Sequence, residues 1–251
     1  MNRQKDPAVL VCDIEGTLTD RSGRKTSPEL LARLRALESA GVCIVLASGR
    51  GVGYQRELRK KWGLADGPIV AENGCTIYAD GEETTTFPPN TFDRASMLYD
   101  LRQKGAERIA EFDPDKKHEI TLYPKGFLAG REYTAEDISA IYEFLLRSLR
   151  GVPCRIFYTS ASGEVLPASV DKGSGLRRLF EKAGLDRARA LFIGDGQNDI
   201  PAADFILEGG GRVGAPANAV EQLKEVATFV SAKEYFEGAI EAIDHFYPEK
   251  R

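Results

Sequence analysis

The sequence predicts an α/β fold in which a doubly wound parallel sheet is interrupted by a smaller, inserted α+β domain. Toward both ends of the chain, short apolar runs typical of strands buried on both faces alternate with amphipathic helical segments. This alternation stops between Pro88 and Ala168, where the order helix, strand, strand, helix, strand, strand indicates a two-layer module with an antiparallel sheet. We therefore predict a core formed by residues 1–87 and 169–251 and an insert formed by residues 88–168.

The first part of the core carries clear start and stop signals. Val9–Cys12 is an apolar strand, and Ser27-Pro28-Glu29 gives the next helix an N-cap, a proline in its first turn and an acidic start. Glycines end this helix and the following one, and Asp80-Gly81 is a hairpin turn. The expected elements are a helix over 28–40, a strand over 42–47, a helix over 52–62, a strand over 68–71 and hairpin strands over 76–79 and 84–87.

The insert and the last part of the core are predicted from the same kinds of signal. In the insert we expect helices over 91–104 and 135–149 and strands over 107–112, 119–123, 154–158 and 164–167. The segment 107–112 also fits an extension of the preceding helix, whereas Thr134 and Asp137 clearly cap the second helix. The core then resumes with a helix over 174–183, a strand over 190–193, a short helix, a strand over 212–214, a helix over 217–226, a strand over 228–230 and a helix ending near 246.

Composition excludes several classes of function. The chain has 251 residues and a net charge of −4, which gives no indication of nucleic-acid or membrane-surface binding. No apolar run approaches the ~20 residues of a membrane span, and no apolar signal segment is visible at the start, so we expect a cytoplasmic protein. The four cysteines are scattered, and two of them, Cys12 and Cys43, fall in expected strands. They are expected to be free thiols, and two histidines make a histidine-based site improbable.

Two carboxylates follow the first strand directly. Asp13 ends the apolar run, and Glu15 lies two residues further on, beside a turn that Gly16 permits and Thr17 completes with a hydroxyl group. Ligands of open α/β sheets bind at the carboxyl ends of the strands. Carboxylates there suit Mg²⁺ binding and nucleophilic attack on phosphorus, although a strand followed by an ordinary acidic turn has the same pattern.

Polar residues at three further element ends are expected to meet the same sheet edge. Ser48 follows the second strand, Lys172 precedes a helix, and Asp195 and Asp199 lie after the strand over 190–193. Each is unremarkable alone, as a helix cap, a surface lysine or an acidic turn. Their occurrence in this order around an inserted module indicates one site.

These segments together resemble the four motifs of the haloacid dehalogenase superfamily of phosphatases. The matching segments are DIEGT (13–17), Ser48, DKG (171–173) and GDGQND (194–199). The insert lies between the second motif and the lysine, as in the C2-type caps of the superfamily. Its αββαββ order resembles the small C2B-type caps of the Cof-type members, and of archaeal phosphoglycolate phosphatases in particular. The segment ENG (72–74) and the segments ANA (217–219) and FVS (229–231) are also similar to elements of those members. The resemblance covers nearly the whole chain.

The resemblance implies a role for each matching residue. Asp13 is expected to be the nucleophile that forms an aspartyl phosphate, Glu15 the acid and base, and Lys172 the cation that keeps Asp13 ionised. The expected Mg²⁺ ligands are Asp13, the backbone carbonyl of Glu15, Asp195 and, through a coordinated water or the lysine, Asp199. The residues expected to bind the substrate and its phosphate are Gly16, Thr17, Ser48, Gly49, Arg50, Asn73 and Asn198.

One position departs from the usual pattern of the superfamily. Where most members have Asp, this chain has Glu15, whose side chain is one methylene longer. Enolase-phosphatases resemble the chain at this position, so we expect Glu15 to function, with its proton-transfer geometry reset by its surroundings. Archaeal phosphoglycolate phosphatases can carry other residues where this chain has Arg50, so the resemblance to them is less specific than the resemblance to the superfamily.

The expected function is Mg²⁺-dependent hydrolysis of a small phosphorylated metabolite, with phosphoglycolate as the first candidate. A sugar phosphate, such as a glycosyl phosphoglycerate or sucrose phosphate, is the alternative substrate, and a phosphomutase is the alternative reaction. A non-catalytic phospho-ligand sensor remains as a different class. Cations of the insert, including Lys116 and Arg131, fit either substrate recognition or solvated loops. The protein is expected to be a monomer or a homodimer with no nucleic-acid or membrane partner.

Overall fold

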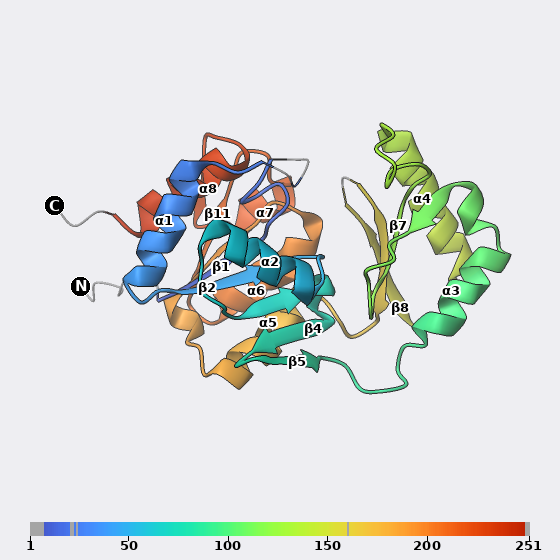
Figure 1. Cartoon of the computed structure of the whole chain (residues 1–251), viewed down its shortest axis with the longest axis horizontal. Helices are drawn as coiled ribbons and strands as arrows, with labels where there is room; N and C mark the ends of the chain where they lie inside the picture. Colours follow the sequence, from blue (N-terminus) through green and yellow to red (C-terminus); the bar gives the residue numbers. More distant parts are fainter. Residues whose placement is uncertain (1–7, 21–22, 24, 160, 249–251) are drawn as a thin grey trace. The chain divides into compact units, whose positions relative to one another are not determined.

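The chain divides into two compact units, of which one runs up to Thr84 and resumes at Asp171, and the other is Thr85–Val170 (Figure 1). This architecture was obtained as a computed structural model, which describes residues 8–20, 23, 25–159 and 161–248. The first unit contains a mostly parallel sheet with helices on both faces, and the second contains a separate antiparallel sheet. The predicted α/β fold class is confirmed.

The first unit is built on an eight-stranded sheet with the order β12-β11-β10-β1-β2-β3-β4-β5. The strands from β12 to β3 pair in parallel, and β4 runs antiparallel to β3. The strand order reverses beside β1, which lies between β2 and β10, and such a switch point is where open α/β sheets bind ligands. The strands are β1 (Val9–Cys12), β2 (Cys43–Ala47), β3 (Ile69–Ala71), β4 (Thr76–Ala79), β5 (Glu82–Thr85), β10 (Ala190–Ile193), β11 (Arg212–Ala215) and β12 (Phe229–Val230).

Alternate residues of the strands pack into two different cores. Val9 and Val11 of β1 face the core formed with helices α5 (Lys172–Ala183), α6 (Ile200–Glu208) and α7 (Glu221–Val226). Leu10 and Cys12 face the core formed with α1 (Pro28–Ser39), α8 (Tyr235–Phe246) and the end of α2 (Val52–Trp62). Burial on both faces explains why the strands are apolar throughout and fixes the direction of every side chain along them.

The second unit is a two-layer module. Its sheet has the order β6-β7-β9-β8, with antiparallel pairing throughout. Apolar residues of the two helices, such as Leu101 and Leu145, pack on one face of this sheet against Ile120, Leu122 and Val165. The elements are α3 (Arg94–Gln103), β6 (Ala110–Phe112), β7 (Ile120–Pro124), α4 (Ala135–Ser148), β8 (Cys154–Tyr158) and β9 (Gly163–Pro167).

Several predicted boundaries are wrong by a few residues, each for a local reason. Strand β5 begins at Glu82 because Asp80 and Gly81 both have positive φ, 53° and 82°, which closes a two-residue turn. Helix α3 begins after Asp93, whose carboxylate accepts the backbone N–H of Ser96. The predicted strand over 107–112 starts only at 110, after a 3-10 turn over 106–108. The units meet at 84/85 and 170/171, whereas we predicted 87/88 and 168/169.

One predicted helix start is wrong for a reason that concerns the site. The helix expected from 217 begins only at Glu221. The preceding residues are not helical because the backbone N–H of Val220 donates to the carbonyl oxygen of Asp195 at 2.9 Å. Lys172, expected just before a helix, is instead the first residue of α5.

None of the helices formed by the described residues has the length and apolar composition needed to cross a lipid bilayer.

Candidate active site

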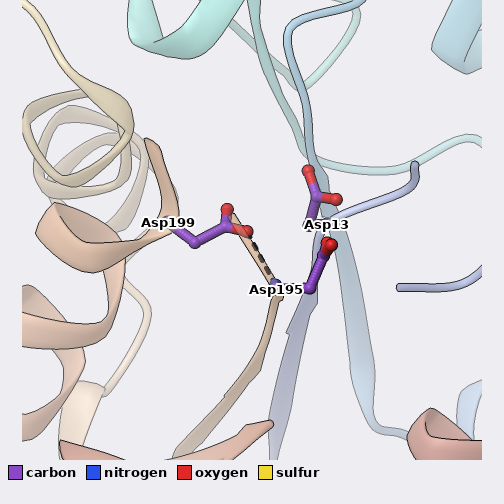
Figure 2. Close-up of side chains that lie close together, drawn as sticks. All are labelled: Asp13, Asp195 and Asp199. Carbon is purple, nitrogen blue, oxygen red and sulfur yellow. Dashed lines mark hydrogen bonds between the residues drawn. The ribbon is translucent and has the colours of Figure 1, made fainter. Parts of the chain in front are cut away.

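Three aspartates meet at the carboxyl end of the two central strands. Asp13 follows β1 and Asp195 lies two residues after β10, and these strands pair in parallel with Cys12 opposite Ile193. Asp199 ends the 3-10 turn η4 (Gln197–Asp199) that follows β10. One oxygen of each carboxylate lies within 4.8 Å of the others. Figure 2 shows the three side chains, with Asp199 directed toward the backbone of Asp195.

Lys172 binds two of these carboxylates from the start of α5. Its Nζ lies 2.8 Å from Oδ1 of Asp13 and 2.5 Å from Oδ1 of Asp199, and the residue is 1% exposed. The position of Lys172 is fixed by a capping box, in which Asp171 accepts the N–H of Ser174 at 2.7 Å and its own N–H donates to the Ser174 hydroxyl. The helix cap therefore places the ammonium group inside the acidic cluster.

Asp199 organises the loop that carries Asp195. Its second oxygen, Oδ2, accepts the backbone N–H groups of Asp195 and Gly196, both at 2.9 Å. Asp199 is fully buried, and its two oxygens are thus used by Lys172 and by the loop. This arrangement makes Asp199 a fixed support of the site, while Asp195 keeps its carboxylate directed toward Asp13.

The turn after β1 closes onto Asp195. The hydroxyl group of Thr17 donates to Oδ1 of Asp195 at 2.8 Å. Gly16 has a φ of 81°, and a Cβ atom there would lie 2.4 Å from Oδ2 of Asp195. Glycine is therefore required at this position both by the backbone conformation and by the close approach of the carboxylate.

Burial and mutual repulsion make the cluster electrostatically costly. The pKa of Asp13 is raised well above its usual value, mainly by burial and further by Asp199 and Asp195, although Lys172 opposes the shift. Burial and Asp199 also raise the pKa of Asp195, to about 7. Burial lowers the pKa of Lys172, but Asp13 and Asp199 more than compensate, so it lies above its usual value. Three carboxylates with one ammonium group have excess negative charge, which a divalent cation bound by these oxygens would neutralise.

The stability of the metal-free protein is expected to decrease as the pH rises from about 4 to 7. The raised pKa of Asp195 means that the folded protein binds its proton more tightly than the unfolded chain, so folding takes up protons in this window. The pKa of this carboxyl group is about 3.9 in the unfolded chain and about 7 in the folded protein. We expect this one partly exposed group to lower the free energy of unfolding by about 2–4 kcal/mol over this pH range. Urea unfolding at pH 5 and pH 8, with a chelator present, measures the change.

Two controls connect this pH dependence to the cluster. Asp195→Asn removes the titrating group and should flatten the difference between the two pH values. Saturating Mg²⁺ should raise the free energy of unfolding at pH 8 by about 2–4 kcal/mol, because the carboxylates that would bind it come together only in the folded chain. If the chelated protein is equally stable at both pH values, the cluster does not have the charge inferred for it.

Glu15 lies at the edge of this cluster, and its side chain binds residues of the next strand end. Its Oε2 accepts the Ser48 hydroxyl at 2.8 Å, and its Oε1 accepts Nε–H of Arg50 at 2.6 Å. The Ser48 oxygen in turn accepts the backbone N–H of Arg50 at 3.1 Å. The hydrogen of Ser48, which we expected to reach the substrate's phosphate, is donated to Glu15 here.

The remaining predicted substrate-binding residues form a bridge between two loops. The side-chain NH₂ of Asn198 donates to Oδ1 of Asn73 at 2.9 Å, and the Asn73 N–H donates to the Ser48 carbonyl at 3.2 Å. Asn73 has a φ of 52°, unusual for a residue other than glycine. Gly49 lies against it, because a Cβ atom at position 49 would be 3.0 Å from Asn73 Nδ2. Asn198 and Asn73 thus connect the turn that carries Asp199 to the loop that follows β2.

Sequence reasoning missed one residue of the site. The NH₂ group of Asn218 donates to Oδ2 of Asp195 at 3.1 Å and to the carbonyl oxygen of Gly16 at 2.9 Å. Its own oxygen accepts the N–H of Tyr235 at 2.6 Å. Asn218 was visible only as part of a segment similar to those of Cof-type phosphatases. An asparagine between two alanines, in a segment predicted as helix, gave no chemical signal of its own.

Comparison with known proteins agrees with this geometry. The family model described as sucrose-6F-phosphate phosphohydrolase matches residues 6–247. A protein of Methanopyrus kandleri named phosphoglycolate phosphatase is 30% identical over 232 residues, which cover 92% of this chain and 93% of that protein. The family-model match spans both units of the chain and every residue of the candidate site.

Solved structures share the fold over nearly the whole chain. A haloacid dehalogenase-like hydrolase from Bacteroides thetaiotaomicron superposes with a TM-score of 0.73 at 21% identity, covering 96% of this chain and 100% of that one. The sucrose-phosphatase of Synechocystis, solved with sucrose and phosphate, has a TM-score of 0.68 at 19% identity and covers 96% and 98%. At these identities the similarity is one of fold.

Proposed function

The chain belongs to the haloacid dehalogenase superfamily of phosphatases, in the family described as sucrose-6F-phosphate phosphohydrolase, and on this premise we propose that it is a Mg²⁺-dependent phosphatase of a small phosphomonoester acting through Asp13. The observation that supports the proposal best is the meeting of Asp13, Asp195 and Asp199 within 4.8 Å, with Lys172 on two of them. Phosphate monoesters are hydrolysed extremely slowly in water, so neutralising charge on the phosphoryl group is the main catalytic task.

The donor set fits Mg²⁺. This ion prefers oxygen ligands in an octahedral arrangement and retains several waters. We propose that it is held by the carboxylates of Asp13 and Asp195 and by the backbone carbonyl of Glu15, with Asp199 supporting the site through Lys172 and the loop after β10. When bound, the ion supplies positive charge beside the transferring phosphoryl group.

The residues of the chain then divide the reaction between them. Asp13 forms a bond to phosphorus while the bond to the leaving oxygen breaks, and Glu15 gives that oxygen its proton. Glu15 then takes a proton from the water that cleaves the aspartyl phosphate, which releases inorganic phosphate and restores Asp13. Lys172, bound to Asp13 at 2.8 Å, favours the ionised form of the nucleophile.

The proposed contacts to the substrate come from the loops around Asp13 and Glu15. We propose that Asn73 and Asn198, which are joined by a side-chain hydrogen bond of 2.9 Å, and the loop at Ser48 and Gly49 bind the phosphate. Gly16 and Thr17 border it through the turn after β1, whereas Arg50, which the sequence placed among the substrate-binding residues, pairs with Glu15 instead.

Phosphoglycolate is the first candidate substrate, supported by relatives that bear this name at about 30% identity over the full length. A sugar phosphate is the second, supported by the family model that the chain matches. The free cysteines, among them the buried Cys12 and Cys75, suit a reducing compartment such as the cytoplasm.

A panel of phosphorylated metabolites tests both candidates. We expect Mg²⁺-dependent release of inorganic phosphate, with kcat/KM for phosphoglycolate at least ten times that for sucrose 6-phosphate and hexose phosphates. The reverse order would favour the sugar phosphates. Transfer of the phosphoryl group to a second position of the substrate, without phosphate release, would indicate a mutase. Mg²⁺-dependent binding without turnover would indicate a sensor.

Replacing Glu15 by Gln is expected to lower the steady-state rate by about 10²–10³-fold, since acid and base catalysis are both removed. With p-nitrophenyl phosphate, whose leaving group needs no proton, the phosphoenzyme should still form. A burst of about one equivalent of p-nitrophenol, followed by slow turnover, is therefore the expected trace in rapid-mixing measurements. Glu29→Gln, on the exposed face of α1, is the matched control and should behave as wild type. Unchanged turnover of the Glu15 variant would rule out its role as acid and base.

A further inference from the structure

The carboxylate of Glu15 is held at both of its oxygen atoms. Ser48 donates its hydroxyl hydrogen to Oε2 at 2.8 Å, and Arg50 donates Nε–H to Oε1 at 2.6 Å. We propose that Ser48 and Arg50 form a clamp that positions Glu15 for proton transfer, and that Arg50 is a positioning residue of the reaction. This inference rests on the proposed phosphatase function, in which Glu15 is the acid and base.

The clamp is itself held in place. The hydroxyl oxygen of Ser48 accepts the backbone N–H of Arg50 at 3.1 Å, which ties the two donors together. The Arg50 carbonyl oxygen accepts hydrogen bonds from the Gln55 side chain at 2.8 Å and from the Glu72 N–H at 3.1 Å. The guanidinium group also lies 5.1 Å from the ring centre of Tyr54, within the range of cation–π attraction.

A clamp of this kind offsets the additional flexibility of the glutamate side chain. Compared with aspartate, Glu15 has one more rotatable bond, and each added torsion multiplies the side-chain conformations that place the carboxylate away from the leaving oxygen. A misplacement of about 1 Å at a reacting group can cost about 10²-fold in rate. Hydrogen bonds between charged groups are stronger and more directional than neutral ones, so two donors on one carboxylate restrict it effectively.

The ion pair between Arg50 and Glu15 contributes little to folding stability. The side chains of Arg50 and Glu15 are 36% and 28% exposed, and pairs of such exposure contribute about 0–1 kcal/mol to folding. The Arg50→Gln variant should therefore fold as wild type does. A loss of activity in this variant then reports on chemistry at Glu15 or on substrate binding, and these two possibilities predict different kinetics.

The test compares substrates that differ in their need for a general acid. The Arg50→Gln variant is expected to lose about 10–100-fold in kcat/KM for an alkyl phosphate such as phosphoglycolate, and less than about threefold for p-nitrophenyl phosphate. The parameter kcat/KM is used because it reports the steps up to formation of the aspartyl phosphate. Arg56→Gln, which breaks an arginine–carboxylate pair further along α2, is the matched control and should change neither value. Ser48→Ala removes the other donor to Glu15 and also a proposed contact to the phosphate, so it should lower kcat/KM for both substrates, with the larger loss for phosphoglycolate.

A double-mutant cycle completes the test. In the Glu15→Gln background, Arg50→Gln should change the ratio of the two kcat/KM values by less than about twofold, because there is no acid left to position. Equal losses for both substrates, or a full further loss in the Glu15→Gln background, would mean that Arg50 contacts the substrate directly, and would overturn the proposal. An inactive wild-type enzyme would instead refute the phosphatase function, so the two failures are distinguishable.

Discussion

Replacing Asp13 by Asn is expected to abolish phosphatase activity, with kcat lowered by at least about 10⁵-fold, as in other enzymes that lose their nucleophile. Asparagine keeps the shape of the side chain, and its oxygen can still accept the Lys172 ammonium hydrogen that Asp13 accepts at 2.8 Å. What the variant loses is the negative charge that attacks phosphorus. No phosphoenzyme should therefore be trapped by acid quench, even with p-nitrophenyl phosphate.

The same variant should be more stable than wild type when metal is removed. Burial raises the pKa of Asp13 and neighbouring carboxylates raise it further, so the ionised side chain is destabilising in the metal-free protein. We expect the free energy of unfolding of Asp13→Asn at pH 8, with a chelator present, to exceed that of wild type by about 1–3 kcal/mol. Asp204→Asn, on the exposed side of α6, should change neither activity nor stability. Residual activity above about 1% would contradict the assignment of Asp13 as nucleophile.

The residues of the site that follow buried strands could be predicted from the sequence. Parallel strands must be apolar on both faces, so a carboxylate such as Asp13 at the end of Val9–Cys12 stands out from its neighbours. The same contrast identified Ser48 after β2 and Asp195 after β10. Their convergence follows from parallel pairing, which brings all carboxyl ends of the strands to one edge.

The contacts between these side chains could not be predicted in the same way. That Ser48 donates to Glu15 depends on side-chain torsions and on the path of the backbone between β2 and α2. Asn218 reaches Asp195 because the segment before α7 is held out of helix by the hydrogen bond from Val220 to Asp195. Such tertiary hydrogen bonds override local helix propensity and leave no periodic pattern in the sequence.

Replacing Lys172 by Met is expected to remove both activity and stability, and the pH dependence of the loss identifies its cause. The ammonium group is buried and is shared between Asp13 and Asp199, at 2.8 and 2.5 Å. Without it, two buried carboxylates lose their counter-charge, and removing one partner of a buried ion pair costs about 3–5 kcal/mol. We expect this loss at pH 8 in the presence of a chelator, as measured by urea unfolding.

At pH 5 the loss of stability should be much smaller. Asp13 already has a pKa well above its usual value through burial, and without Lys172 this pKa rises further, so its carboxylate takes up a proton from solution and no longer needs the ammonium group. Activity should fall by at least about 10³-fold even with saturating Mg²⁺, since an uncharged side chain cannot favour the ionised nucleophile or bind a phosphoryl oxygen.

Lys182→Met, on the same helix, is the matched control. Lys182 pairs with the exposed Glu82 at 3.1 Å, and its loss should cost less than about 1 kcal/mol. If Lys172→Met is destabilised equally at both pH values, the loss comes from packing of the side chain and the charge argument for the site is wrong.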